Sequence, residues 1–358
     1  MELKPMLFWD TKTVLTYMEP NFRFNLALKI PSIRKAEKAA PLIINRLVLH
    51  ENHLVIDETE YKMKVYRQCQ ADAGLHNGEV DNDSDEYGFK IILDETYQPG
   101  DIKLTYNGNK GRGRICTLER FQYNCQAKVN SLPCNHYIRL YVSGSMTQFP
   151  YRNMKMHHLM RRLLTILFGN RTGEWTVKNI RVEDKIMRWP LTGRKPYVRN
   201  IELGLHSLLK MNAFHSIIDL SVPIARLKMR SFYSAIEDHP LFKHVEHLKI
   251  SNTLFSLSLS HFFSIQTLKV SITRPTSLVE NLDELISKLM EEMRPIGVRY
   301  SILVKEKVNL DTINHPTILE ISTDYMQLAM GSEAVVVVQY TEDDRRTWLN
   351  IEVISREI

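Results

Sequence analysis

The stretch VLTYMEPNFRFNLALKIPSIRKAEKAAPLIINRLVL, from Val14 to Leu49, contains three short helical runs followed by a strand-like run. Proline residues separate the runs, because proline is tolerated at a helix start and disfavours helix in the residue before it. These prolines are Pro20, Pro31 and Pro41. Helical spacing predicts three apolar faces, which are Val14, Leu15 and Met18, then Phe22, Leu26 and Ile30, and finally Ile33, Ala36 and Ala40. A unit this small buries little surface alone, so we expect it to dock onto the rest of the chain or onto a partner.

The overall composition is that of an ordinary globular protein. The chain has 358 residues, 44% of them hydrophobic, and its formal charge of +6 arises from nearly balanced acids and bases. Such a balance does not favour nucleic-acid binding. The start, MELKPMLFWD, lacks a basic region followed by a long apolar core, and no apolar run is long enough to span a bilayer. We expect a soluble cytoplasmic or nuclear protein with no membrane segment and with its four cysteines reduced.

A β-rich region is predicted for residues 41–150, after a helical unit at residues 1–40. Short runs of alternating or β-branched residues predict an antiparallel sheet, at Ile43–Leu49, Leu54–Ile56, Tyr61–Tyr66, Phe89–Leu93, Ile102–Tyr106, Phe121–Val129 and Tyr137–Val142. Two polar segments between them, Asp72–Glu86 and Asn107–Arg114, are predicted to be exposed loops.

The third predicted region, residues 151–358, begins with the amphipathic run MKMHHLMRRLLTILFGN. Its helix presents an apolar face, and Gly169 is expected to take the left-handed conformation that often ends a helix. This face is formed by Met156, Leu159, Leu163, Ile166 and Leu167.

An internal repeat of the form apolar-x-x-apolar-x-apolar follows that helix. Its five copies start 21, 26, 21 and 20 residues apart, within the range of leucine-rich repeats. The copies are Val177, Ile180, Val182; Val198, Ile201, Leu203; Ile224, Leu227, Met229; Val245, Leu248, Ile250; and Ile265, Leu268, Val270. They lack a repeated Asn, so we expect an irregular arc or a twisted parallel sheet, with unrelated α/β segments as the alternative.

The last part of the chain is predicted to contain one helix and four strands. The helix has an apolar face of Leu278, Leu282, Leu285, Ile286, Leu289 and Met293. The strands are expected at Val298–Val304, Ile318–Ser322, Val335–Tyr340 and Trp348–Ile354, where they extend the sheet or cover its open end.

Residues suited to chemistry are sparse. Cys116, Cys125, Cys134 and His136 have poor spacing for a zinc site, so we expect no metal. The run Asp81, Asp83, Asp85 lacks the Gly and Glu that a calcium loop needs, and is interpreted as a solvated loop.

Two basic stretches are also interpreted as solvent-exposed. Gly108, Gly111 and Gly113 alternate with basic residues but lack the frame of a phosphate-binding loop, which favours a hairpin tip. A basic cluster on the helix near residue 160 is interpreted as a solvated face, with an acidic partner as the alternative; it comprises Arg152, Lys155, His157, His158, Arg161 and Arg162. No catalytic motif is evident, so we expect neither an enzyme nor a cofactor.

The N-terminal stretch, the LVIDETEY that follows it and the helix ending in LFGN resemble a known family. This is the nematode-expanded family of F-box C type proteins, which carry a nematode-specific domain of unknown function. The matching residues are Val14-Leu15, Tyr17, Glu19-Pro20-Asn21, Arg23, Pro31-Ser32-Ile33, Lys35, Lys38 and Pro41-Leu42. The chain departs from the pattern at Lys29-Ile30-Pro31, where the family usually has Arg-Cys-Pro. The resemblance covers residues 5–170 well and the repeat half loosely.

The residue patterns and the resemblance together predict an α+β protein: the patterns give an antiparallel β-rich middle and an irregular leucine-rich-repeat-like α/β C-terminal half, and the resemblance implies that the short N-terminal helical unit is F-box-like. The resemblance also implies a substrate-recognition adaptor of a cullin-RING ubiquitin ligase, with the N-terminal helices on the Skp adaptor and the repeat half on a target protein. Candidate Skp-binding residues are Leu7, Phe8, Trp9, Val14, Leu15 and Phe22. Three alternatives stay open: these residues form the core of their own domain; the chain is an interaction scaffold with no ligase connection; or it is an enzyme of unrecognised class, which only the glycine-rich basic loop and the Cys/His group favour.

Overall fold

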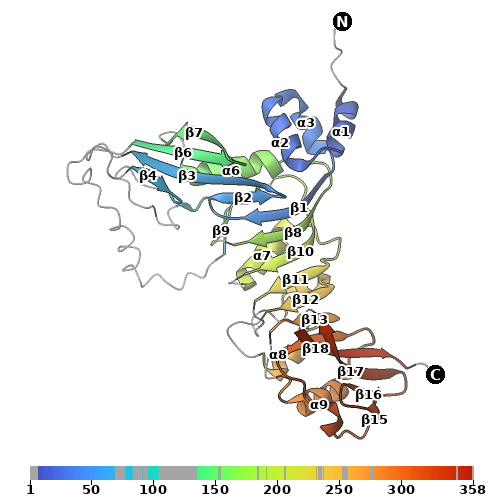
Figure 1. Ribbon diagram of the computed structural model, residues 1–358. Helices are drawn as coiled ribbons and strands as arrows, with labels where there is room; N and C mark the ends of the chain where they lie inside the picture. Colours follow the sequence, from blue (N-terminus) through green and yellow to red (C-terminus); the bar gives the residue numbers. More distant parts are fainter. Residues whose placement is uncertain are drawn as a thin grey trace. The chain divides into compact units, whose positions relative to one another are not determined.

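The protein is a mixed α+β chain, seen here in a computed structural model (Figure 1). It divides into two compact units, residues 1–198 with 212–219, and residues 199–211 with 220–358. The boundaries expected at residues 40 and 150 therefore both fall inside the first unit. The structure describes residues 7–356 except for 69–76, 84–90, 92–95, 105–134, 152–154, 184, 191, 205–206, 231, 233–235, 237, 252–256, 275–277 and 344–345.

The first unit begins with the predicted helices. The helices are α1 (Phe8–Thr16), α2 (Pro20–Lys29) and α3 (Arg34–Ala39), with a 3-10 turn, η1, at Pro31–Ile33. Prolines open α2 and η1, and β1 (Leu42–Leu49) starts one residue after Pro41, so the punctuation by proline is confirmed. The predicted apolar face of the second run is wrong, because Phe22 and Ile30 are exposed while Arg23, Phe24 and Ala27 are buried.

A mainly antiparallel sheet follows these helices in the first unit. Its strand order is β7-β6-β3-β2-β1-β8, with β4 on β3, and only the β1–β8 pair is parallel. The strands after β1 are β2 (His53–Ile56), β3 (Thr59–Gln68), β4 (Gly78–Val80), β6 (Asn135–Val142), β7 (Ser145–Pro150) and β8 (Trp175–Val182), with β5 (Ile102–Lys103) paired to β9 (Ile186–Met187) in a separate sheet. The strand predicted at Phe121–Val129 lies outside the described residues, as does that at Phe89–Leu93 apart from Ile91, which is not in a strand.

The predicted amphipathic helix is present as α6 (Met156–Phe168). Most of its predicted apolar face is buried, but Ile166 is exposed. Gly169 does not adopt the left-handed conformation expected of it: its φ is −67°, and the next residue, Asn170, has φ 56°. Below α6, Phe168 stacks on Trp175 and Trp189 at centroid distances of 5.4 and 5.8 Å.

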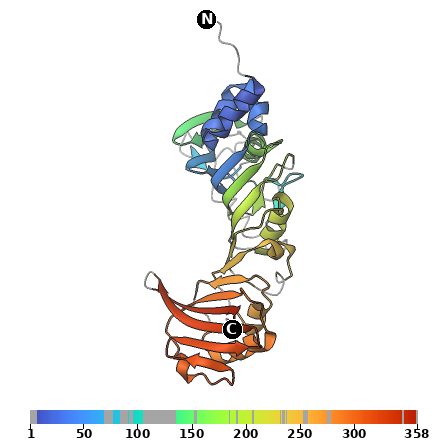
Figure 2. The same cartoon turned by 90° about the vertical axis from the view of Figure 1, so that its right-hand side faces the viewer.

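The second unit is built on consecutive parallel strands. The order β10-β11-β12-β13-β14 follows the chain, and β18, β17, β16 and β15 continue the sheet as antiparallel neighbours, seen as the red strands of Figure 2. The strands are β10 (Tyr197–Leu203), β11 (Arg226–Met229), β12 (His247–Ile250), β13 (Lys269–Ile272), β14 (Arg299–Val304), β15 (Ile318–Ile321), β16 (Tyr325–Met330), β17 (Ala334–Asp343) and β18 (Arg346–Ser355). The C-terminal strands thus extend the sheet, as one of the two expectations had it.

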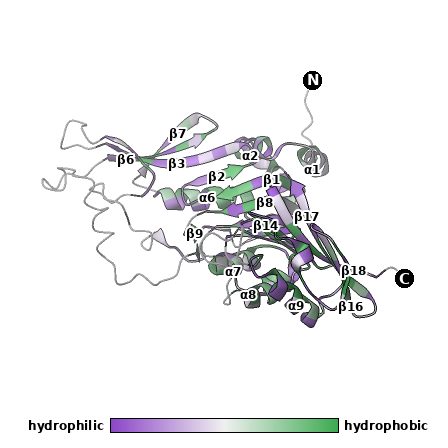
Figure 3. Ribbon diagram, turned by 60° about the horizontal axis from the view of Figure 1, so that its bottom comes forward, coloured by the Kyte–Doolittle hydropathy of each residue, from purple (hydrophilic) through white to green (hydrophobic). Residues whose placement is uncertain are grey.

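Helical segments connect the parallel strands. They are α7 (Ser207–Ile217), η5 (Pro240–His244), α8 (Leu259–Phe263) and α9 (Leu282–Glu292), with η6 (Leu310–Thr312) after β14. In Figure 3, α9 carries both hydrophobic and hydrophilic colours, consistent with its predicted amphipathic pattern. Met293, predicted on the apolar face, is exposed instead, because the chain turns there with φ 46°.

The first predicted repeat copy lies on β8 of the first unit, copies two to four lie on or lead into β10, β11 and β12, and the fifth needs a correction. In the fifth copy Leu268 is 49% exposed, and the core positions of β13 are Val270 and Ile272. Val270 lies in register with Leu248 of β12 and Tyr300 of β14, so the core residues of β13 lie two residues later than the fifth predicted copy.

Within the described part of the chain, no helix is long and apolar enough to cross a membrane.

Candidate partner-binding site

The N-terminal helices are organised by local caps and a small apolar core. The Glu19 carboxylate accepts hydrogen bonds from the backbone N–H groups of Asn21, at 3.0 Å, and Phe22, at 2.7 Å, which satisfies the free donors at the start of α2. Leu15 packs with Ala36 and Ala40, whose small side chains let α1 approach α3 closely. The three helices therefore form one packed unit.

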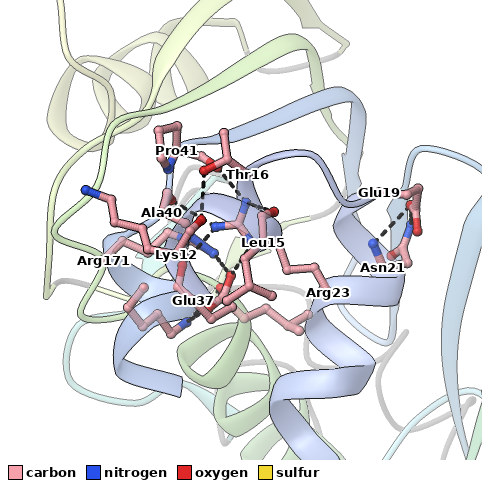
Figure 4. A network of polar contacts seen from close by, with 12 residues as sticks. Lys12, Leu15, Thr16, Glu19, Asn21, Arg23, Glu37, Ala40, Pro41 and Arg171 are labelled. Carbon is pink, nitrogen blue, oxygen red and sulfur yellow. Dashed lines mark hydrogen bonds and ion pairs between the residues drawn. The ribbon is translucent and has the colours of Figure 1, made fainter. Parts of the chain in front are cut away.

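A buried ion network lies under this unit (Figure 4). The Arg23 Nε donates to the Glu37 carboxylate at 3.1 Å, and its Nη2 donates to the carbonyls of Glu37 and Ala40 at 2.8 and 2.9 Å. Arg171, from the segment between α6 and β8, donates to the same carboxylate. All three side chains are almost completely buried. The network links α2 and α3 to the segment that leads into β8.

Two guanidinium groups share one carboxylate in this network. Burial lowers the pKa of Arg171 to about 10 and also lowers that of Arg23, and the negative charge of Glu37 opposes both shifts. Carbonyl oxygens of Leu15 and Pro41 also accept from Arg23, which spreads the excess positive charge over backbone dipoles. The arrangement is strongly held only while Glu37 keeps its charge.

Two further contacts attach the helices to the sheet and to α6. The Asn21 amide donates to the Ile56 carbonyl at 3.0 Å, and the Tyr61 hydroxyl donates to the Asn21 side-chain oxygen at 3.0 Å. Burial, with the charge of Glu19 adding to it, raises the pKa of Tyr61 to about 12. The Lys38 ammonium donates to the carbonyls of Ile166 and Leu167 at the end of α6. Its pKa is lowered to about 8, first by burial and then by the charge of Arg171.

Large apolar side chains are exposed on these fixed helices. We call Leu7, Trp9, Val14, Tyr17 and Phe22 the exposed apolar set; their exposed fractions range from 42% for Val14 to 86% for Tyr17. Trp9 and Val14 lie in α1, Leu7 and Tyr17 are the N-cap and C-cap residues of that helix, and Phe22 lies in α2. Exposed apolar residues of this size are typical of protein-binding surfaces when they gather on a rigid element.

The six residues predicted from the sequence to bind a partner do not all belong to the exposed apolar set. Leu7, Trp9, Val14 and Phe22 are well exposed. Phe8 is 37% exposed, and its ring packs against that of Trp9 in a T-shaped arrangement with 5.3 Å between the ring centroids. Leu15 is 1% exposed and belongs to the core of the helical unit. For Leu15, the structure therefore supports the alternative interpretation that it is a core residue of its own domain.

The acidic run Asp81, Asp83, Asp85 is not solvated throughout. The interpretation as a solvated loop is wrong for Asp83, which is buried and accepts hydrogen bonds from the backbone N–H groups of Met156, at 2.7 Å, and His157, at 3.0 Å. It also pairs with the His157 ring and accepts from the Tyr151 hydroxyl at 2.8 Å. Asp83 thus caps α6 from a distant part of the chain, and Asp85 lies outside the described residues.

The basic cluster on α6 is likewise only partly solvated. His157 is buried against Asp83, and Arg161 donates to the Pro99 carbonyl at 2.7 Å. Arg152 lies outside the described residues, as does the glycine-rich loop with Gly108, Gly111 and Gly113. Three of the four residues weighed and rejected as zinc ligands also lie outside them: Cys116, Cys125 and Cys134. His136 is buried with its ring 5.3 Å from that of Tyr151. The described residues contain no group of His, Cys, Asp or Glu side chains arranged to hold a metal ion.

The sequence alone did not indicate that Glu37 and Arg171 form a buried ion pair. A signal for part of the network was present, because some of the residues that carried the resemblance build these contacts. Glu19 caps α2, Asn21 joins it to the strands, and Arg23 is the centre of the network. Much of that motif therefore specifies how the helices are fixed to the sheet.

Comparison with known proteins gives one match. A family model described as a domain of unknown function (DUF3557) matches residues 155–306, which run from α6 to just beyond β14. No curated protein and no solved structure matches the chain.

Proposed function

We propose that this chain is a non-catalytic substrate-recognition adaptor of an SCF-type cullin-RING ubiquitin ligase, related to the F-box C type proteins it resembles. The N-terminal helices bind the Skp adaptor and the repeat half binds a target protein. The observation that carries the proposal is the exposed apolar set on helices that a buried ion network fixes to a sheet. A preformed helical surface binds with little ordering cost, which suits a docking module.

The consecutive parallel strands of the repeat half support an interaction role. Ile201, Leu227, Leu248, Val270 and Tyr300 occupy matching positions of consecutive parallel strands and lie 26, 21, 22 and 30 residues apart. We interpret this as an irregular leucine-rich-repeat-like array closed by the antiparallel strands β15–β18. Arrays of this kind present one sheet face along many strands, and that face is suited to a protein partner.

The test is capture by the Skp adaptor during co-expression. Variants Trp9→Asp and Val14→Asp place charge in the exposed apolar set without touching the helical core, so they are expected to fold and to lose capture. Leu319→Asp, an equally exposed apolar residue on β15, is the matched control and is expected to keep it. Absence of capture for the well-folded parent chain would contradict the proposal.

The alternative is a protein-interaction scaffold with no ligase connection. It is favoured by the fact that Glu19, Asn21 and Arg23 have structural roles, so the resemblance could persist without Skp binding. A partner bound by the second unit in the absence of any Skp complex would distinguish the scaffold from the adaptor.

A further inference from the structure

The second unit contains a basic hollow of about 500 Å³ where β10–β13 end. Five of its lining residues are basic: Lys228, Arg230, Lys249, Arg274 and Arg346. Among the described lining residues Glu202 alone is acidic. This excess of cations contrasts with the near balance of charge over the whole chain.

The strand pattern explains why these cations gather. In β11 and β12 the residues on either side of Lys228 and Lys249 are buried in the core, so both lysines point to the opposite face. Lys228 lies in register with Lys249, one strand spacing of about 4.8 Å away. Arg346 opens β18, at the end of the strand that pairs with β14. The sheet itself therefore fixes a row of like charges.

The positive charge of this row is only partly compensated. Glu202 pairs with Lys228 at 2.7 Å. No ion pair joins Lys249, Arg274 or Arg346 to an acid of the described residues. Burial, and then the charges of Arg226, Lys228 and Arg346, lower the pKa of Lys249. An anion in the hollow would remove this repulsion.

Beyond the hollow the same face carries further basic residues and also Glu352. His247 lies in register with Lys269, and Lys269 with Arg299, on the side of the sheet opposite the core, and Arg299 in turn pairs with Glu352 of β18. Burial and then the neighbouring charges of Arg226, Lys249 and Lys269 lower the pKa of His247. A ligand with several negative charges, spread along a chain, matches this row better than one small anion does.

We propose that the basic hollow binds an acidic peptide segment, in which Asp and Glu carboxylates pair with Lys249, Arg274 and Arg346. This inference rests on the proposed role of the repeat half as the target-binding half, and it gives the target's contact segment its chemistry. A peptide fits better than a nucleic acid, because sites for single strands stack successive bases on aromatic rings and Trp348 is the one aromatic residue in the described lining.

The test measures direct binding of the full chain to a labelled peptide of alternating Glu and Gly residues, with no Skp adaptor present. The control ligands are the same peptide with Gln for Glu and a single-stranded oligonucleotide of similar length. The pocket variant is Lys249→Glu with Arg346→Glu, and a second, Arg230→Glu with Arg274→Glu, changes only exposed residues of the lining. The matched control variant, Lys243→Glu with Arg356→Glu, makes the same change in net charge outside the hollow.

We expect the Glu peptide to bind the parent chain and the control variant alike. Each folded pocket variant should weaken binding about tenfold or more, and added salt should weaken it in the parent chain. The Gln peptide should not bind. The proposal is overturned if the Glu peptide does not bind, if pocket and control variants lose affinity equally, or if the oligonucleotide binds more tightly through the same residues. Because the assay omits the adaptor, its result is independent of Skp capture.

Discussion

Arg23 of α2 and Glu37 of α3 form an ion pair with 3.1 Å between Nε and Oε1, and both side chains are almost completely buried. Arg171 reaches the same carboxylate from a segment more than a hundred residues later in the chain. One carboxylate thus holds together the helices that expose the apolar set and the sheet that supports them.

Removing the negative charge of Glu37 should strongly destabilise the folded protein. Glu37→Gln keeps the shape of the side chain but leaves two buried guanidinium groups without a counter-charge, so we expect the free energy of unfolding to fall by about 3–5 kcal/mol. Lys35→Gln, an exposed change on the same helix, should alter it by less than about 0.5 kcal/mol. Urea denaturation of both variants is the measurement, and equal stability of the two would contradict the role of the network.

Lys38 should titrate far below an ordinary lysine. Its pKa of about 8 is set first by burial and then by Arg171. Because the unfolded chain holds this proton up to about pH 10.4, the folded state should gain stability as pH rises from about 8 to 10, if other groups are unchanged. Site-resolved NMR titration of the lysine side chains tests the value. A Lys38 midpoint near 10.5 would show that the ammonium is not buried as described.

Asp83 should stabilise the fold above the pH at which it protonates. Burial alone would raise its pKa, but the hydrogen bonds and charge of His157 and the Tyr151 hydroxyl outweigh burial and hold the pKa below its ordinary value. Its contribution is then fully present above about pH 4 and is lost as pH falls through the folded pKa.

The matching variant removes the charge of Asp83. Asp83→Asn should lower the free energy of unfolding at pH 7 by about 3 kcal/mol and flatten its decline in acid. Asp81→Asn, on a more exposed neighbour, should do neither. Chemical denaturation of both variants from neutral to acidic pH is the measurement, and identical pH profiles for them would refute the capping role.

Gly173 should tolerate no side chain. A Cβ atom there would lie 2.5 Å from the Ala39 carbonyl oxygen, where the segment before β8 passes the end of α3. Gly173→Ala should therefore cost about 1–3 kcal/mol. A Cβ on Gly78 would meet nothing within 4 Å, so Gly78→Ala should change stability by less than about 1 kcal/mol. Thermal melts of the pair compare the two positions, and a tolerated Gly173→Ala would mean that α3 is not held against this segment.

The sequence predicted elements better than it predicted which side chains are buried. Prolines marked the starts of α2 and β1, and the repeat pattern located β10–β12 with their core residues. The buried face of α2 was predicted wrongly. Helical periodicity placed Phe22 and Ile30 in the core, but the charged residue Arg23 is buried and these two apolar residues are exposed. Periodicity of hydrophobic residues cannot reveal a site whose burial depends on a distant carboxylate and several carbonyls.

Long-range contacts account for the other errors. Asp83 is part of a polar run, and its burial depends on the start of α6, 73 residues away. The fifth repeat was shifted because Leu268 fits the apolar pattern, while register with β12 and β14 selects Val270. The strands β4, β7, β9 and β16 were not predicted, and β4 lies in the stretch Asp72–Glu86 that was predicted to be an exposed loop. β7 is largely exposed and polar, so it lacks the pattern that marks a half-buried strand. Of the six residues that the sequence proposed for partner binding, Leu15 is buried and the other five are exposed to different degrees, while the exposed Tyr17 was not named; their role in binding stays a prediction.

The central claim is that the exposed apolar set binds the Skp adaptor, and the most direct measurement is the affinity of the purified chain for the purified adaptor. The account predicts a stable one-to-one complex, weakened at least about a hundredfold by Trp9→Asp with Val14→Asp and unchanged by Leu319→Asp. A well-folded parent chain that does not bind the adaptor would contradict the account, and so would equal affinity of the parent and the Trp9→Asp, Val14→Asp variant.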